Sequence, residues 1–376
     1  MPRRLLEPRG GIVITSTEHS TASLADGYIT ADQRDGLFEH IGGLLGRAQT
    51  VWLFCHENPD GDTVGCNSAV YEALTRMGKE VRMFTPDPMP RMYADLPFAG
   101  RFEHVSELPG ELPDIVMAND NGAFDRLGKA YCAQLTRMGI GPEATEKAAG
   151  CVMINMDHHL GNQCYGDINL VDPSFGACGE LFYRFFRHLG WEVSLETAIN
   201  LYATIITDTG RFSYGNTKHE TFVIASELIE IGVDPFDVYN RVYNTRTPGQ
   251  MRLLAMILNT MTANDELGYF YCYVTQRMVR ETGTLLSDTE GATDILKTVA
   301  GYDATYFLKE EEDGNVKVSA RSNQGFDVRA VARRFGGGGH TAASGFRIHA
   351  GIDEAPAILE RELRLHMEEL RLGSGD

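Results

Sequence analysis

The sequence lacks any apolar run that approaches the ~18 residues a membrane-spanning helix needs. Its basic start, Met1-Pro2-Arg3-Arg4, is not followed by a continuous apolar segment, so no secretory signal is predicted. Cysteine is scarce and scattered, with seven residues and no C-x-x-C pair. This distribution argues against a disulfide framework or a zinc knuckle and favours a reducing compartment. We therefore expect a cytoplasmic protein that does not associate with a membrane.

Positive charge is also in short supply. The chain has 34 lysine and arginine residues against 52 aspartate and glutamate residues, which gives a formal net charge of −18. A protein that binds long nucleic acid needs a basic surface that releases counterions. We therefore expect no long nucleic acid as a partner. If the substrate carries phosphate, it is expected to be short and held by local metal ions and arginines.

The length of 376 residues and the apolar content of 43% suit a globular chain with two cores. The periodicity of apolar residues predicts an α/β protein. We expect a poorly ordered extension over 1–30, a catalytic α/β domain over 31–245, a helical linker over 246–261 and a smaller α/β domain over 262–376. The first domain is expected to contain a mostly parallel sheet flanked by helices, with the active-site cleft between the two domains.

Acidic residues and histidines follow several segments that are typical of buried strands. The apolar segment 51–55 is followed by His56, Asp60 and Asp62. The segment 115–118 is followed by Asp120, and the segment 151–154 by Asp157, His158 and His159. Ligands of open α/β sheets bind beyond the carboxyl ends of the strands. An acid and two adjacent histidines are costly to bury there unless a charged partner, such as a divalent metal ion, lies beside them.

Each of these groups also has a plain structural interpretation. Asp60 and Asp62 could belong to an acidic surface turn, or to a calcium loop. Against the calcium loop, Thr63 occupies the position of its glycine and Ala69 that of its bidentate glutamate. Asp208, between two threonines and before a glycine, adds a further acid at the end of a predicted helix. The joint occurrence of all these residues at similar positions favours a pair of metal ions bridged by a carboxylate.

The same residues resemble the signatures of a known family. Residues 56–62 read H-x-x-x-D-x-D, and a single aspartate follows at 120. D-H-H follows at 157–159 and T-D-T-G at 207–210. These motifs, in this order, resemble those of the DHH phosphoesterase family. Residues 319–322 and 336–345 resemble the DHH-associated second domain. Within the family, the chain is most similar to the stand-alone nano-RNase/pAp phosphatase (NrnA-like) type.

The resemblance implies two metal ions, with Mn²⁺ as the usual ion and Mg²⁺ or Co²⁺ as substitutes. The first implied ligand set is His56, Asp60 and Asp120. The second is Asp62, Asp120, His158 and Asp208, so that Asp120 bridges the two ions. Two metal ions ~3.5–4 Å apart can clamp a phosphoryl group and lower the pKa of a bridging water, so that hydroxide attacks phosphorus in line.

Two further residues of the first domain are candidates for the chemistry. His159 is expected either to donate a proton or hydrogen bond at the scissile phosphate or to orient its neighbours. Asp157 is expected to support the metal ligands and not to bind a metal itself.

The second domain is expected to bind the substrate. Arg321 supplies a planar fork for phosphate, and a run of glycines lets backbone N–H groups approach an anion. A flexible linker is the alternative for these glycines, but a predicted helix precedes them and a predicted strand follows. The predicted substrate-binding residues are Ser319, Arg321, Ser322, Gly337, Gly338, Gly339 and His340.

The resemblance implies a metal-dependent phosphodiesterase and phosphatase. It would hydrolyse oligoribonucleotides of about two to five nucleotides to 5′-mononucleotides, as an exoribonuclease of the 3′–5′ type, and pAp to AMP. The nearest alternative is hydrolysis of cyclic dinucleotides or of linear pApA and pGpG. A non-catalytic nucleotide-binding regulator is a third hypothesis. The expected ligands are short RNA or small nucleotides. The chain could also form a homodimer.

Overall fold

A computed structural model describes residues 29–289, 291–322, 326–339 and 341–373. The chain divides into two compact units, Met1–Thr245 and Arg246–Asp376. The predicted substrate-binding residue His340 and most of the predicted extension lie outside the described residues. Within the described part of the chain, no helix combines the length and the apolar character needed to cross a lipid bilayer.

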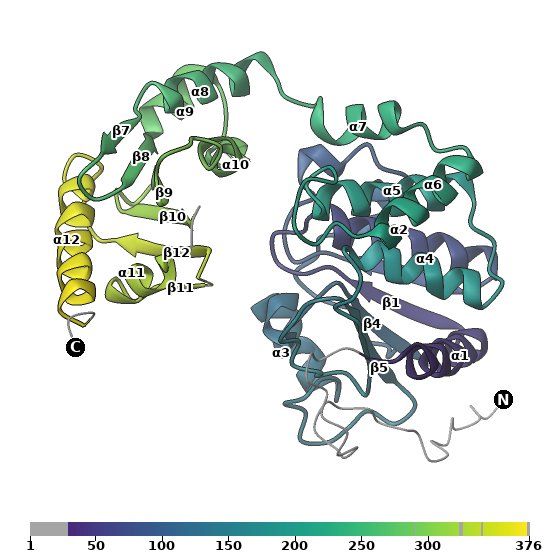
Figure 1. Ribbon diagram of the computed structural model, residues 1–376. Helices are drawn as coiled ribbons and strands as arrows, with labels where there is room; N and C mark the ends of the chain where they lie inside the picture. Colours follow the sequence, from purple (N-terminus) through teal and green to yellow (C-terminus); the bar gives the residue numbers. More distant parts are fainter. Residues whose placement is uncertain (1–28, 290, 323–325, 340, 374–376) are drawn as a thin grey trace. The chain divides into compact units, whose positions relative to one another are not determined.

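The first unit is built on a six-stranded sheet in the order β3-β2-β1-β4-β5-β6, of which β1, β4 and β5 are labelled in Figure 1. Its strands are β1 (Thr50–Phe54), β2 (Glu80–Phe84), β3 (Phe102–Glu103), β4 (Ile115–Asn119), β5 (Val152–Asp157) and β6 (Ile168–Val171). All neighbouring strands are parallel. The chain order therefore reverses between β1 and β4, which is the usual ligand-binding position in such a sheet. The predicted mostly parallel sheet is confirmed.

Both faces of this sheet are buried, because each is covered by a separate core. Successive side chains of a strand point to opposite faces and so enter different cores. In β1, Val51 and Leu53 pack with one set of helices, whereas Trp52 and Phe54 pack with the residues on the other face. The helices on the first face are α1 (Ala31–Arg47), α2 (Gly61–Arg76), α4 (Cys178–His188), α5 (Leu195–Asp208), α6 (His219–Ile231) and α7 (Pro235–Tyr243). The opposite face is covered by α3 (Lys129–Arg137) and by the 3-10 turn η3 (Phe124–Leu127). Two more 3-10 turns, η1 (Arg91–Tyr93) and η2 (Ala99–Arg101), follow β2.

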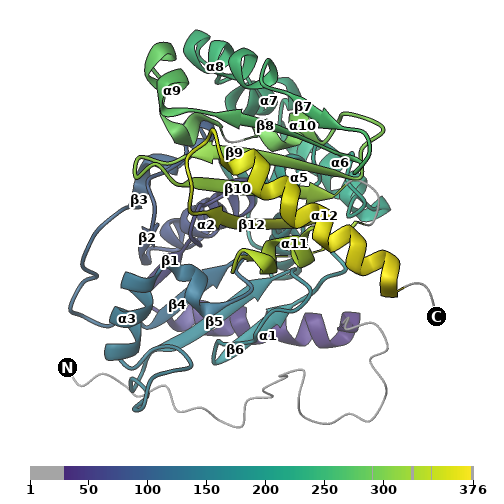
Figure 2. The ribbon, with the colours of Figure 1, turned by 90° about the vertical axis from the view of Figure 1, so that its left-hand side faces the viewer.

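The second unit contains its own six-stranded sheet, in the order β11-β12-β10-β9-β8-β7 (Figure 2). The strands are β7 (Thr262–Asn264), β8 (Tyr269–Val274), β9 (Ala304–Glu310), β10 (Val316–Ser322), β11 (Gly338–Gly339) and β12 (Ala343–Ile348). Neighbouring strands are antiparallel except β8 and β9, which are parallel. A smaller α/β unit after the first one confirms the predicted fold class.

Helices cover both faces of the second sheet. One face packs against α11 (Val328–Arg334) and α12 (Ala355–Gly373), and α12 crosses in front of the strands in Figure 2. The other face packs against α8 (Pro248–Leu258), α9 (Gln276–Thr282) and α10 (Ala292–Leu296), beside the 3-10 turn η4 (Leu286–Thr289). Helix α8 lies in the segment expected to be a linker, and its Leu253 and Ile257 are part of the core of this unit.

Candidate metal centre

The loop after β1 places two candidate ligands, His56 and Asp60, at the carboxyl end of the sheet. His56 is buried, and its ring Nδ1 donates a hydrogen bond of 2.9 Å to the carbonyl of Glu57. Its Nε2 lies 3.6 Å from Asp60 Oδ1. Asp60 is the N-cap of α2, because its Oδ1 accepts hydrogen bonds from the backbone N–H groups of Asp62 and Thr63. The start of α2 therefore fixes these side chains relative to one another.

Asp120, directly after β4, has a backbone that few residues other than glycine adopt. Its φ of 56° lies in the left-handed region, which is unfavourable for a residue with a Cβ. The backbone is held there by the N–H of Asp120, which donates to the carbonyl of Met156 on the neighbouring strand β5. In this position one carboxylate oxygen lies 3.7 Å from His56 Nε2 and the other 3.6 Å from His158 Nε2. Asp120 thus lies between two histidines that follow different strands, β1 and β5.

Asp62, in the first turn of α2, is almost completely buried against the start of α4. Its two carboxylate oxygens accept hydrogen bonds from the backbone N–H groups of Cys178 at 2.6 Å and Gly179 at 3.0 Å. The N-terminus of a helix favours a negative charge, so this contact stabilises the ionised carboxylate. Residue 179 has to be small, because a Cβ there would lie 1.7 Å from the Thr204 hydroxyl oxygen.

A second group of candidate ligands surrounds His158, which follows β5. The ring Nδ1 of His158 donates to the carbonyl of Phe175 at 3.2 Å, which leaves Nε2 as the atom that faces the acids. This Nε2 lies 3.6 Å from Asp62 Oδ2 and 3.5 Å from Asp208 Oδ2. Asp208 is the last residue of α5.

The contacts among these residues fit metal coordination better than direct hydrogen bonds. Separations of 3.5–3.7 Å are too long for hydrogen bonds. Two donor atoms bound to one ion at about 2.1 Å lie roughly 3–3.5 Å apart, which is close to these separations. Within the described part of the chain, Asp120 Oδ1 and His158 Nε2 are buried and have no hydrogen-bond partner. Both sets, His56/Asp60/Asp120 and Asp62/His158/Asp208, have donor atoms within 4.8 Å of one another.

The pKa shifts in the site also favour bound metal ions. Burial raises the pKa of Asp62 and Asp120 well above the usual value, and repulsion from neighbouring carboxylates raises them further. Burial together with the charge of Asp60 raises the pKa of Asp208 to about 7. Burial also lowers the pKa of His158, so its imidazole is neutral and available as a ligand. Two divalent cations would relieve the repulsion, and the donor set fits them.

The predicted catalytic pair lies at the edge of this cluster. Asp157 Oδ1 accepts hydrogen bonds from the His158 backbone N–H at 2.8 Å and from His159 Nδ1 at 2.7 Å. Its other oxygen accepts a hydrogen bond from Asn162 Nδ2 at 2.5 Å. The side chain of His159 is 44% exposed, and its Nδ1 lies 3.6 Å from Asp120 Oδ1. Asp157 therefore orients the ring of His159 and holds the backbone of His158, while His159 is accessible from solvent.

The predicted substrate-binding residues that are described all lie in the second unit. On β10, Val318 and Ala320 face the core with α11 and α12, so Ser319 and Arg321 lie on the opposite face. Ser322 ends the strand and donates its N–H to the carbonyl of Ala342.

The glycine run of the second unit is ordered. Gly338 and Gly339 form β11, which pairs with Ser344 and Gly345 of β12. Gly337 passes so close to the carbonyl of Gly345 that a Cβ would lie 2.3 Å from it. Close packing of two backbones accounts for this glycine.

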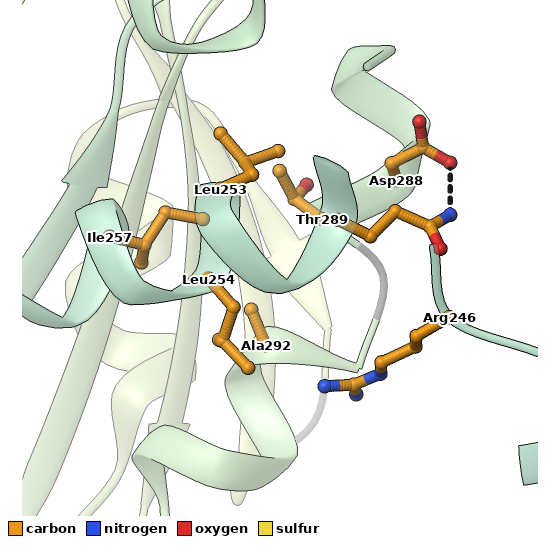
Figure 3. A pocket seen from close by; sticks show the side chains of 8 residues that line it. Arg246, Leu253, Leu254, Ile257, Asp288, Thr289 and Ala292 are labelled. Atoms are coloured by element: carbon orange, nitrogen blue, oxygen red, sulfur yellow. Dashed lines mark hydrogen bonds between the residues drawn. The ribbon is translucent and has the colours of Figure 1, made fainter. Parts of the chain in front are cut away.

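A small pocket in the second unit is not a second metal centre. It is lined by the apolar side chains of Leu253, Leu254, Ile257 and Ala292 and by the polar side chains of Arg246, Gln250, Asp288 and Thr289 (Figure 3). Its one carboxylate, Asp288, accepts a hydrogen bond of 2.6 Å from Gln250. The carboxylate is thus already paired inside its own unit.

Some residues around the centre were not predicted from the sequence. Arg126 in η3 places its Nη2 3.2 Å from His56 Nδ1, and the backbone N–H groups of Cys178 and Gly179 hold Asp62. One signal for the latter was present: the N-cap of α4 is Ala177, which has no side chain able to cap a helix. An uncapped, buried helix start indicates that a group from elsewhere in the chain accepts its N–H bonds.

The fold and the clustered acids and histidines define a chain of the DHH class. Residues 50–207 match the model of the DHH family, N-terminal domain, and residues 268–364 match that of the DHHA1 domain. The chain belongs to the DHH family, as predicted from its motifs.

Its relatives include two curated proteins called bifunctional oligoribonuclease and PAP phosphatase NrnA. The protein from Thermus thermophilus is 31% identical over 322 residues, which cover 85% of this chain and 90% of the relative. The protein from Bacillus subtilis is 27% identical over 316 residues, covering 82% and 92%. A solved structure of an exopolyphosphatase-related protein from Bacteroides fragilis is 25% identical, with a TM-score of 0.78, and covers 89% of this chain and 98% of that one.

Proposed function

We propose that this protein is a metal-dependent phosphodiesterase and phosphatase. It would hydrolyse oligoribonucleotides of very few residues to 5′-mononucleotides, and pAp to AMP. The observation that carries the proposal is Asp120, whose two oxygens each face a different histidine within a buried group of carboxylates. Relatives named for oligoribonuclease and PAP phosphatase activity align with most of the chain, which supports the choice of substrates.

The proposed cofactor is a pair of Mn²⁺ ions, with Mg²⁺ or Co²⁺ as substitutes. When bound, such ions stabilise charge on phosphoryl oxygens and lower the pKa of water. In this proposal His56, Asp60 and Asp120 hold one ion, and Asp62, Asp120, His158 and Asp208 hold the other. The carbonyls of Glu57 and Phe175 keep the two histidines oriented with Nε2 toward the acids.

His159 is the proposed donor at the reacting phosphate. Its Nδ1 is bonded to Asp157 and its ring is partly exposed, so the other nitrogen is accessible to a substrate. From there it can donate a proton or a hydrogen bond to an oxygen of the scissile phosphate. Asp157 fixes the direction of the ring in this role.

The second unit is proposed to hold a phosphate of the substrate through Arg321. Replacing Arg321 by alanine is expected to raise KM for a dinucleotide about 10- to 100-fold, since a hydrogen bond to a charged group contributes about 1.5–3 kcal/mol. Binding of Mn²⁺ should not change. Arg361→Ala is a matched control, because Arg361 lies exposed on α12, on the opposite face of this sheet. An unchanged KM in Arg321→Ala would remove this residue from the substrate site.

The function is tested by following mononucleotide release with Mn²⁺ from pAp, pGpG, cyclic di-AMP and a 5′-labelled RNA ladder in parallel. Fast hydrolysis of dinucleotides and pAp, with rates that fall as the ladder lengthens, is the expected result. If the cyclic dinucleotide is hydrolysed fastest, the proposed metal centre still stands, but the proposed substrate is wrong. Equal rates for dimers and for oligomers of ~10 nucleotides or more would contradict the short-substrate proposal.

A further inference from the structure

One segment, residues 172–179, contacts His158 and Asp62 directly and is linked to Asp208 through one further side chain. The carbonyl of Phe175 accepts the hydrogen bond from His158 Nδ1, at 3.2 Å. The N–H groups of Cys178 and Gly179 bind the carboxylate of Asp62. The positions of two of the three donor side chains therefore depend directly on the backbone of this segment.

The third member, Asp208, is linked to the same segment through Asn216. The side-chain Nδ2 of Asn216 lies 2.7 Å from the carbonyl of Gly176 and 3.3 Å from Asp208 Oδ2, so one amide joins the two. His56 and Asp60, by contrast, are held by the carbonyl of Glu57 and by the start of α2. The two ligand sets are thus oriented by different parts of the chain.

The 172–179 segment is itself anchored by Arg34 of α1. Asp172 is completely buried, and its Oδ2 accepts a hydrogen bond of 3.1 Å from Arg34 Nη1. Its other oxygen accepts the N–H of Ser174 at 3.0 Å, which shapes the turn. The Arg34 guanidinium also lies over the ring of Phe175, 5.3 Å from its centroid. A planar cation can make both contacts at once.

A second cation, from a later part of the first unit, also supports the segment. Lys218, at the start of α6, donates from Nζ to the carbonyls of Pro173 and Ser174 at 3.3 and 2.5 Å. Arg34 differs in that it touches Phe175, whose carbonyl orients His158. Arg34 and Lys218 both lie outside residues 50–207, the part of the chain that matches the family model of the N-terminal domain.

We propose that Arg34 is a positioning residue for the Asp62/His158/Asp208 set. It fixes the 172–179 segment through Asp172 and Phe175, and so raises the affinity of this set for its metal ion without acting on the His56/Asp60/Asp120 set. The inference rests on the proposed metal-dependent function. It adds a residue from α1, remote from the ligands in the sequence, to the structure that supports the centre.

The test is a Mn²⁺ titration of the metal-free protein, in which the free ion is counted by electron paramagnetic resonance. Wild type should bind two ions. Arg34→Ala should weaken one of them by about tenfold and leave the other unchanged. This is the lower end of the cost of losing a group bonded to a metal ligand, because Arg34 acts through Asp172 and Phe175. Arg47→Ala is the matched control, since Arg47 is an exposed arginine in the last turn of the same helix. Arg34→Lys should restore the affinity only in part.

Loss of Arg34 also leaves the Asp172 charge buried without its cation, which lowers stability. The double variant Arg34→Ala/Asp172→Asn removes that charge and should recover the melting temperature without recovering the affinity for the weakened ion. The inference would be overturned if the double variant recovered both the melting temperature and the affinity. It would also be overturned if Arg34→Ala weakened the binding of both ions equally, or of neither. A wild-type protein that binds no divalent ion would instead overturn the proposed function.

Discussion

Replacing Asp120 by asparagine is expected to reduce hydrolysis of a dinucleotide by at least about a thousandfold, or ~4 kcal/mol of barrier. Asp120 Oδ2 lies 3.7 Å from His56 Nε2, and Oδ1 lies 3.6 Å from His158 Nε2 and 3.6 Å from His159 Nδ1. An amide keeps the shape but offers one oxygen and one N–H₂ group, which cannot bind a cation. The variant should therefore bind Mn²⁺ more weakly at both ligand sets, which an ion-counting titration measures.

A control for this variant is available in the same loop. Asp125 is exposed in η3, five residues further on, so Asp125→Asn makes the same chemical change outside the buried cluster. It should leave both the rate and the number of bound ions unchanged. A loss of less than about tenfold in Asp120→Asn, ~1.4 kcal/mol, would instead favour the hypothesis of a non-catalytic nucleotide-binding regulator.

Gly179→Ala should damage both the stability of the first unit and its metal binding. The added Cβ would lie 1.7 Å from the Thr204 hydroxyl oxygen and 2.6 Å from its Cβ, so α4 and α5 have to move apart. Overpacking of this kind costs about 1–3 kcal/mol, which lowers the melting temperature by several degrees. The shift also moves the N–H groups that hold Asp62, and melting curves with and without Mn²⁺ should show less stabilisation by the metal.

Two further variants make this prediction specific. Gly36→Ala, in α1, places its Cβ where no atom lies within 4 Å, so it should leave stability unchanged or raise it by up to about 1 kcal/mol. Thr204→Ala removes the hydroxyl that collides with residue 179 and should rescue Gly179→Ala in part. A Gly179→Ala protein that melts like wild type, with full stabilisation by Mn²⁺, would show that the helix start is not tightly constrained.

The strand ends were predictable from the sequence because each combines a short apolar run with an abrupt change to acids and histidines. The sheet was confirmed as parallel, and β1, β4 and β5 are adjacent in it, so the residues that follow them meet at one edge. The left-handed backbone of Asp120 had no signature in the sequence. Its function as a bridge was inferred from family resemblance, and the structure adds the geometry on both of its sides.

The support of the centre was not predictable in the same way. Asp62 is held by backbone N–H groups 116 and 117 residues away, and Arg34 reaches Asp172 across 138 residues. Backbone donors carry no residue type that a pattern can detect, and an arginine in an amphipathic helix is usually an exposed surface residue. Such contacts depend on how the helices pack against the sheet, which is decided by the whole core.

The proposed ligands come from four distant places in the chain, at 56–62, 120, 158 and 208, so they meet only in the native fold. An unfolded chain cannot offer them together, and any ion that binds the native state alone adds stability by mass action. At a free ion concentration of 100 times Kd, one site contributes about 2.7 kcal/mol. The supply of manganese would then determine how long the protein resists proteolysis in the cell, in addition to how fast it works, and starvation for the ion would reduce its abundance.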